Sequence, residues 1–167
     1  GAELSLTWRA SRNVSAFFNY GWIDASFDKR DDDGNPQKLA GNQFRLTPKN
    51  SASAGLDLGW AVGAAHLYAR PSWNWRSHVY FEDDNSAGIE QDGYALVNLR
   101  LGVQLAGGRW DIALYGNNLA DKDYLIDAGN TGRLFGTPTF IQGLPRTYGI
   151  TVTGKFCPEC GKPRPAA

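Results

Sequence analysis

Apolar and polar residues alternate with a period of two along seven separate segments of the chain. Such alternation predicts β-strands, because successive side chains of a strand point to opposite faces. In one segment, for example, Leu99 and Leu101 share a face from which Arg100 points away. The segments cover approximately residues 3–9, 14–27, 52–60, 65–81, 95–105, 110–117 and 148–156. No helical period competes with them, so the sequence predicts an all-β protein with antiparallel strands.

The connections between these segments are alternately short and long. Short turns lie near residues 11–13, 61–63 and 107–108, whereas long loops begin near residues 27, 82 and 125. Outer-membrane barrels join their strands by short periplasmic turns and longer extracellular loops, and a soluble β-sandwich has no such requirement. The loop pattern therefore favours a transmembrane β-barrel over a soluble sandwich.

The positions of the tryptophans and of the charged residues agree with a barrel. Aromatic side chains gather at the two water interfaces of such barrels, and a charge at the lipid midplane costs about 2–4 kcal/mol. The predicted interface aromatics are Trp8, Trp60 and Trp110 beside short turns, and Trp22, Trp73 and Trp75 toward the long loops. The mid-strand charges all fall on the polar faces, and they are Glu3, Arg9, Asp57, Arg70, Arg76, Arg100, Asp111 and Lys155.

Composition removes two other classes of protein. The chain of 167 residues contains no run that approaches the roughly 18 apolar residues of a transmembrane helix. Its 17 basic and 17 acidic residues balance, which gives no electrostatic case for binding nucleic acid. The first four residues, GAEL, look neither like an initiator segment nor like a signal peptide, so we expect the chain to begin within a larger protein.

Four stretches of sequence resemble motifs of a known family. Residues 117–124 (NNLADKDY) resemble the Asn-Leu-x-Asp-Lys-x-Tyr motif near the end of TonB-dependent receptors, and residues 144–156 resemble the final strand of those proteins. Upstream, residues 20–25 (YGWIDA) are similar to the Tyr-x-x-Leu-Asp-Ala motif near the loop end of a strand in this family. Residues 46–50 (LTPKN) are similar to the Pro-Lys pair that begins the next strand. The resemblance covers residues 1–156.

The resemblance implies a part of a larger barrel. Such receptors are barrels of about 22 strands with a plugged lumen, so this chain would supply the C-terminal seven strands. The implied location is the outer membrane of a Gram-negative bacterium, and the implied partners are outer-membrane lipid, the barrel-assembly machinery and TonB, which would act through a plug absent from this chain. The terminal aromatic strand of the family carries the insertion signal, which would assign that role to Tyr148 and Phe156.

The implied activity is energy-dependent uptake of a scarce nutrient, most often a ferric siderophore, with no enzymatic activity and no cofactor. Contacts with the ligand are expected in the long loops. The candidates are Asp31, Asp32, Asp33, Asp83, Asp84, Tyr124, Phe135 and Phe140. The acidic stretch 28–35 predicts a solvated loop rather than a calcium site, because Gly34 is not where a D-x-D-x-D-G loop requires its glycine.

Two other functions compete with nutrient uptake. A passive channel or structural barrel without energy coupling would share every strand, and only the sequence upstream of Gly1 separates it from an active receptor. An enzymatic barrel would need His66 or His78 beside Asp57 or Asp111. Twelve residues of strand at about 3.3 Å each place the two histidines tens of ångströms apart, so we interpret them as polar residues of the lumen.

The last eleven residues depart from the family pattern, which ends at the aromatic that corresponds to Phe156. Cys157 and Cys160 have the spacing of half a zinc site, but the chain has no second pair of cysteines to complete it. We therefore expect no metal here. The sequence predicts two units, residues 1–156 of the barrel and a Pro-containing, disordered tail over residues 157–167.

Overall fold

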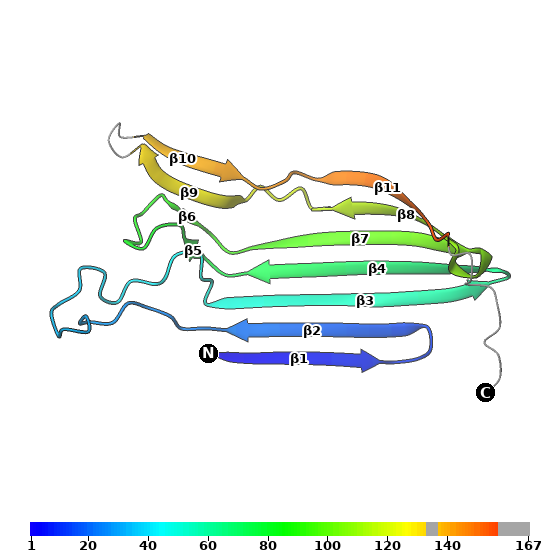
Figure 1. Cartoon of the computed structure of the whole chain (residues 1–167), viewed down its shortest axis with the longest axis horizontal. Coiled ribbons are helices and arrows are strands. Elements are labelled where there is room, and N and C mark those ends of the chain that lie inside the picture. Colours follow the sequence, from blue (N-terminus) through cyan, green and yellow to red (C-terminus); the bar gives the residue numbers. More distant parts are fainter. Residues whose placement is uncertain (133–136, 157–167) are drawn as a thin grey trace.

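The computed structural model describes residues 1–132 and 137–156. Seven long strands form one antiparallel sheet in which each strand lies beside the next long strand of the chain (Figure 1). In order across the sheet these strands are β1 (Ala2–Arg9), β2 (Val14–Trp22), β3 (Asn50–Val62), β4 (Ala65–Arg76), β7 (Tyr94–Leu105), β8 (Trp110–Asn117) and β11 (Thr147–Gly154). The predicted all-β antiparallel fold is confirmed.

Two small hairpins stand outside this sheet. The first pairs β5 (Val79–Tyr80) with β6 (Glu90–Gln91), and the second pairs β9 (Leu125–Gly132) with β10 (Thr137–Gln142). A short 3-10 turn, η1 (Ala106–Gly108), joins β7 to β8. None of the helical structure in the described residues is long and apolar enough to cross a membrane.

The structure corrects three of the predicted boundaries, two of them because of these hairpins. Segment 65–81 is not one strand, because β4 ends at Arg76 and the chain then leaves the sheet to pair with β6. The break occurs where the Ser77 N–H donates to the Asn50 carbonyl and the Ser77 hydroxyl accepts from the Asn50 N–H. Similarly, β2 ends at Trp22 rather than near residue 27, and the predicted loop 125–143 contains β9 and β10.

The register of the sheet keeps one face apolar from edge to edge. Leu67 pairs with Val103, and Val103 pairs with Ile112, which in turn pairs with Val152. On the opposite face, Ser53 pairs with both Asn19 and Asn74. The alternation in each strand therefore adds up to two continuous surfaces of opposite polarity.

The apolar surface of the sheet is exposed. Leu6, Leu114 and Val152 have 54%, 55% and 61% of their surface accessible. Within the described residues the buried apolar side chains are few, and most lie in the loops rather than in the sheet. A contiguous apolar surface of this size requires an apolar environment, because water would meet it unfavourably.

The connections have the alternating lengths that the sequence predicts. The links from β1 to β2, β3 to β4 and β7 to β8 are tight, whereas those that follow β2, β4 and β8 are long. Figure 1 shows all three long connections at one end of the sheet and the tight ones at the other. The six tryptophans of the predicted girdles lie in these strands on the apolar face, and their contact with the membrane interface stays a prediction.

Aromatic rings cover glycines on the neighbouring strand. Tyr68 pairs with Gly102, and a Cβ atom added at Gly102 would lie 2.3 Å from the Tyr68 Cζ atom. Tyr115 covers Gly149 in the same way, where an added Cβ would lie 2.3 Å from the tyrosine oxygen. These glycines leave room for side chains that lie flat along the polar face.

Candidate functional site at the long-loop end

The long connections share one end of the sheet because each follows a strand that runs in the same direction. They comprise residues 23–49, 77–93 and 118–146. A protein that meets a ligand from outside would meet it here first, and all the predicted ligand contacts lie in these three connections. We therefore describe this end as the candidate site.

The family-like motif at residues 117–124 forms the corner by which the chain leaves β8. Asn118 is 3% exposed and has a positive φ of 50°. Its amide donates to the carbonyls of Lys122 and Leu144 at 2.9 and 3.2 Å, and its side-chain oxygen accepts from the Lys122 N–H at 2.9 Å. One side chain thus satisfies main-chain groups from both ends of the third connection.

A second contact closes the same corner. The Asp121 carboxylate accepts from the Arg146 N–H at 3.0 Å and pairs with its guanidinium at 3.4 Å. Arg146 belongs to the Pro-Arg pair that begins the second family-like stretch. The two motifs that carry the resemblance therefore meet in space, and their described contacts hold the chain rather than face outward.

An arginine and two tyrosines stack where β4 and β7 reach the loops. The guanidinium carbon of Arg76 lies 4.7 Å from the centre of the Tyr94 ring, within the range of a cation–π contact. Tyr94 stacks in turn on Tyr124 with ring centres 4.6 Å apart. Arg76 also donates to the Leu125 carbonyl at 3.3 Å, which ties the third connection to the sheet.

Two depressions of about 340 Å³ each open among the loops. The first is bordered by Gln91 and residues 122–125, together with Gln142, Gly143 and Pro145. The second is bordered by Arg45, Glu82 and Asp127 and by the apolar side chains of Phe81 and Ile141. Each combines charged, polar and apolar groups, which is the composition of sites for small ligands.

The predicted acidic contacts of the first connection lie in a turn of their own. Asp31 accepts from the N–H groups of Asp33 and Asn35 at 3.1 and 2.7 Å. Its carboxylate is thereby used to shape the turn, and Asp32 and Asp33 are exposed beside it. Among the described residues, no group of three or more His, Cys, Asp or Glu side chains could hold a metal ion.

The predicted acidic contacts of the second connection bind neighbouring loop segments. Asp83 accepts from the Arg45 N–H at 3.3 Å, and Asp84 accepts from the Ser86 N–H at 3.2 Å. Asp31 shapes a turn within the first connection, whereas Asp83 joins the second connection to the first through Arg45.

The three predicted aromatic contacts, Tyr124, Phe135 and Phe140, do not lie together at one described site. Tyr124 borders the first depression, and Phe140 is a half-exposed residue of β10 that pairs with Ala128. Phe135 lies outside the described residues, as do Cys157 and Cys160. Sequence reasoning missed Arg76 and Tyr94 as members of the stack, because their partner Tyr124 is distant in sequence.

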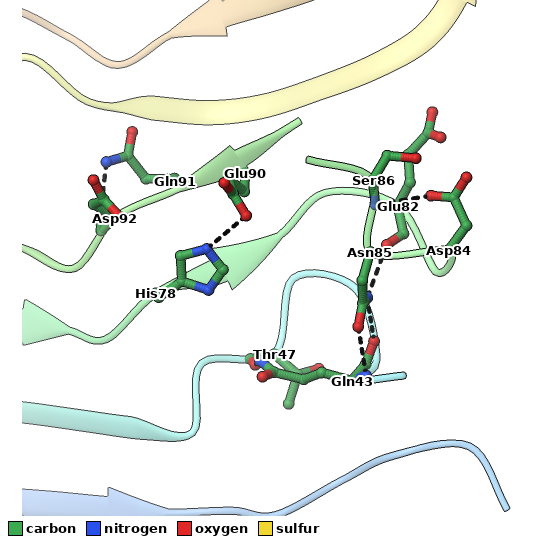
Figure 2. A network of polar contacts seen from close by, with 10 residues as sticks. All are labelled: Gln43, Thr47, His78, Glu82, Asp84, Asn85, Ser86, Glu90, Gln91 and Asp92. Atoms are coloured by element: carbon green, nitrogen blue, oxygen red, sulfur yellow. Dashed lines mark hydrogen bonds and ion pairs between the residues drawn. The ribbon is translucent and has the colours of Figure 1, made fainter. Parts of the chain in front are cut away.

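The histidines and carboxylates of the rejected enzymatic hypothesis have separate partners. Asp57 pairs with Arg70 at 3.1 Å, and Asp111 accepts from the Tyr68 hydroxyl at 2.9 Å and from Gln104 at 3.1 Å. His66 lies near the tight-turn end of β4. His78 lies beyond the other end of that strand and contacts Glu90 at 3.1 Å (Figure 2).

The two residues of the predicted insertion signal lie at opposite ends of the last strand. Tyr148 is in β11 and is largely exposed on the apolar face. Phe156 lies two residues beyond the end of β11, and its ring meets that of Trp110 edge to face at 5.4 Å. Their role in insertion stays a prediction.

An antiparallel sheet with an exposed apolar face, tight turns at one end and long, structured loops at the other defines an outer-membrane β-barrel protein. Residues 1–119 match the family described as "TonB dependent receptor-like, beta-barrel". The chain belongs to this family, which consists of transporters rather than enzymes and is located in the outer membrane of Gram-negative bacteria.

Solved structures of siderophore receptors have the same fold. The ferric yersiniabactin uptake receptor FyuA from Yersinia pestis matches with a TM-score of 0.78 at 25% identity, over 90% of this chain and 22% of the receptor. BauA, the ferric preacinetobactin receptor from Acinetobacter baumannii, matches with a TM-score of 0.66 at 20% identity, over 90% and 21%. The siderophore receptor PiuA from the same organism matches with a TM-score of 0.66 at 18% identity, over 90% and 20%.

The chain spans about a fifth of the length of these receptors. The comparisons therefore define the architecture of a part of the barrel. The ligand, the energy source and the partners of the whole receptor are taken up below as proposals.

Proposed function

We propose that this chain forms part of a receptor that takes up a ferric siderophore across the outer membrane with energy delivered by TonB. The match of residues 1–119 to the receptor barrel family carries the proposal. The similar structures add to it, because FyuA is described as a ferric yersiniabactin uptake receptor, BauA as a ferric preacinetobactin receptor and PiuA as a siderophore receptor.

The long-loop end supports a role in capturing the ligand. It presents two depressions of about 340 Å³ that combine charged and aromatic groups. Tyr124 is the best supported of the predicted contacts, since it borders one depression and its ring is held by Tyr94. Asp31 is less suited, because its carboxylate already binds the main chain of its own turn.

The proposed partners follow from the same assignment. Outer-membrane lipid would cover the apolar face, and TonB would act through the plug domain of the receptor. We also propose that the barrel-assembly machinery recognises the β11 region through Tyr148 and Phe156. The predicted tail, residues 157–167, lies outside the described residues.

The proposal is tested by uptake of radioactive iron in a strain that lacks the receptor. Iron-limited cells are supplied with a panel of ferric siderophores, with and without a plasmid that carries the receptor, in TonB-positive and TonB-negative backgrounds. We expect uptake of at least one chelate to require both the receptor and TonB. Uptake that persists without TonB would favour the passive channel, and unchanged uptake of every chelate would reject the siderophore as ligand.

A further inference from the structure

The first and second long connections are joined by hydrogen bonds through Asn85. Its side-chain oxygen accepts from the Gln43 N–H at 2.8 Å, and its amide donates to the Gln43 carbonyl at 2.9 Å (Figure 2). The side chain thus pairs with both main-chain groups of one residue, as a neighbouring β-strand would. A positive φ of 50° at Asn85 presents the amide in this direction, and asparagine tolerates that conformation better than most residues.

Further bonds extend this junction on both sides. The Asn42 amide donates to the Asp83 carbonyl at 3.0 Å, and the Leu46 N–H donates to the Tyr80 carbonyl at 2.8 Å. Together with the Arg45–Asp83 contact described above, these bonds connect residues 42–46 to residues 80–85 over their whole length. Several of them involve main-chain groups, which have few ways to be satisfied when the loops pack together.

The second and third connections share a buried apolar core. Val79 and Phe81 are 0% and 1% exposed and are the largest fully buried side chains in the described part of the chain. They pack with Ile89 from the same connection and with Ala128 from β9, and Leu125 covers the cluster. The Leu125 N–H also donates to the Gln91 side chain at 2.7 Å.

We propose that these three segments behave as one cooperative unit, which we call the loop assembly and define as residues 42–46, 77–92 and 125–129. Phe81 and Asn85 are its two junctions, one apolar and one polar. Loops that were independent would each expose their main-chain groups. Here residues 77–92 share a buried core with residues 125–129 and hydrogen bonds with residues 42–46. Local structure of this kind opens and closes as a unit, because losing one junction exposes the groups of the other.

Cooperativity would couple the two depressions of the candidate site. Phe81 borders one of them, and Leu125 and Gln91 border the other. Suppose that a ligand binds one depression and favours the state in which both junctions are formed. Because one equilibrium governs both junctions, this ligand would also stabilise the other depression. The inference concerns the loops themselves and holds whichever ligand the receptor takes.

Hydrogen–deuterium exchange on the complete receptor in lipid nanodiscs tests the inference. Asn85→Ala removes the polar junction and touches only the first two segments. We expect it to speed exchange by about tenfold or more not only in residues 42–46 but also in residues 125–129, which Asn85 does not contact. Wild-type exchange in residues 125–129 would overturn the proposal.

A matched control and a second variant complete the experiment. Asn35→Ala truncates an asparagine of the acidic turn, whose amide reaches Asp31 of the same turn, and should speed exchange in residues 30–37 alone. Phe81→Leu reduces the apolar junction while keeping an apolar side chain, and should speed exchange in all three segments together. Faster exchange confined to residues 77–92 would overturn the proposal, and unchanged exchange in β7 shows that the barrel is intact. None of these measurements depends on a ligand, so they stand apart from the test of uptake.

Discussion

Tyr68 lies flat on the polar face of the sheet because Gly102 leaves room for its ring. At 4% exposure it is among the most buried residues of the strands, and its hydroxyl accepts from Arg100 and donates to Asp111. Arg100 also reaches Asp111 at 3.5 Å. The ring of Tyr68 is therefore fixed by its packing over Gly102, and its hydroxyl is fixed by Arg100 and Asp111.

Replacing Gly102 by alanine should destabilise the barrel. The added methyl group would lie 2.3 Å from the Tyr68 ring, so the ring must move and lose its contacts with Arg100 and Asp111. We expect the free energy of unfolding in urea to fall by about 1–3 kcal/mol. Gly129→Ala is the control, because its methyl group would meet nothing closer than 3.6 Å. An equal loss in both variants would mean that the space under Tyr68 is not the cause.

Asn118 should matter for the corner after β8. Asn118→Ala removes three hydrogen bonds of a buried side chain and leaves partly buried main-chain groups of Lys122 and Leu144 without these partners. A buried polar group that loses its partner costs about 1–3 kcal/mol. The free energy of unfolding, measured in urea, should therefore fall by at least that amount.

Its neighbour offers the matched control for this substitution. Asn117 is exposed, and within the part of the chain that the structure describes its amide makes one long contact, of 3.4 Å with Thr147. Asn117→Ala should change the free energy of unfolding by less than about 0.5 kcal/mol. If Asn117→Ala lowered the free energy of unfolding as much as Asn118→Ala, the hydrogen bonds of Asn118 would not be the cause of the loss.

Single residues were predictable from sequence where the period of two fixed their face, and not where a distant partner fixed their role. The placement of Arg70 and Asp57 on the polar face followed from alternation alone. The contact of Asp121 with Arg146 joins residues 25 positions apart, and no local pattern indicates it. The same holds for the pairing of Asn85 with Gln43.

At the scale of elements, the end of β4 shows why the boundary failed. Val79 and Phe81 keep the register of β4, and only Ser77 interrupts its apolar positions, so the period of two did not separate a membrane strand from a loop hairpin. A different pattern does indicate the hairpin. Asn85 and Gly88 have positive φ angles, and asparagine and glycine between two apolar segments are typical of a turn.

The apolar face of β7 should not tolerate a charge. Leu101 lies in the middle of this strand with 44% of its surface exposed, between Ala69 and Leu114 on the adjacent strands. Leu101→Arg should lower the free energy of unfolding in lipid vesicles by about 2–4 kcal/mol, the cost of an arginine at the midplane. Asn74→Arg, on the polar face of β4, should have a much smaller effect. A similar loss in both variants would contradict the assignment of the lipid face.

The native tryptophans should lie near the lipid headgroups, whereas a tryptophan placed at the middle of a strand should lie near the centre of the membrane. Variants that retain only Trp60 or only Trp22 should be quenched most by lipids brominated near the headgroup, because aromatic girdles lie at the interfaces. A variant with Leu101→Trp as its single tryptophan should instead be quenched most by bromine near the chain ends. Equal quenching profiles for all three positions would contradict the prediction that Trp22 and Trp60 lie in aromatic girdles.

For the whole molecule, the architecture was predictable because three independent patterns agree on it. Alternation predicted the strands, loop length predicted their orientation, and the family-like motifs predicted the barrel. The internal organisation of the long loops was not predictable, because their stability comes from packing between connections far apart in sequence. Val79, Ile89 and Ala128 become a core only once the barrel has brought their loops together.

The chain should not form a closed barrel by itself. In the described residues β1 and β11 lie at opposite edges of the sheet, and each is paired on one side only. Strand edges of this kind pair with other chains. We expect the refolded chain in detergent to give a mixture of oligomers on size-exclusion chromatography, without the heat-dependent gel mobility of a closed barrel. A single monomeric species with such mobility would contradict this prediction.

The joining of the three connections in the loop assembly also affects how an immune response would recognise this protein. Residues from three connections form one surface, so an antibody raised against the folded receptor would bind a discontinuous epitope. A synthetic peptide of residues 77–92 lacks Ala128 and Leu125, which cover its apolar side chains. A vaccine antigen derived from this end of the receptor would therefore need all three connections on a scaffold that holds them as the barrel does.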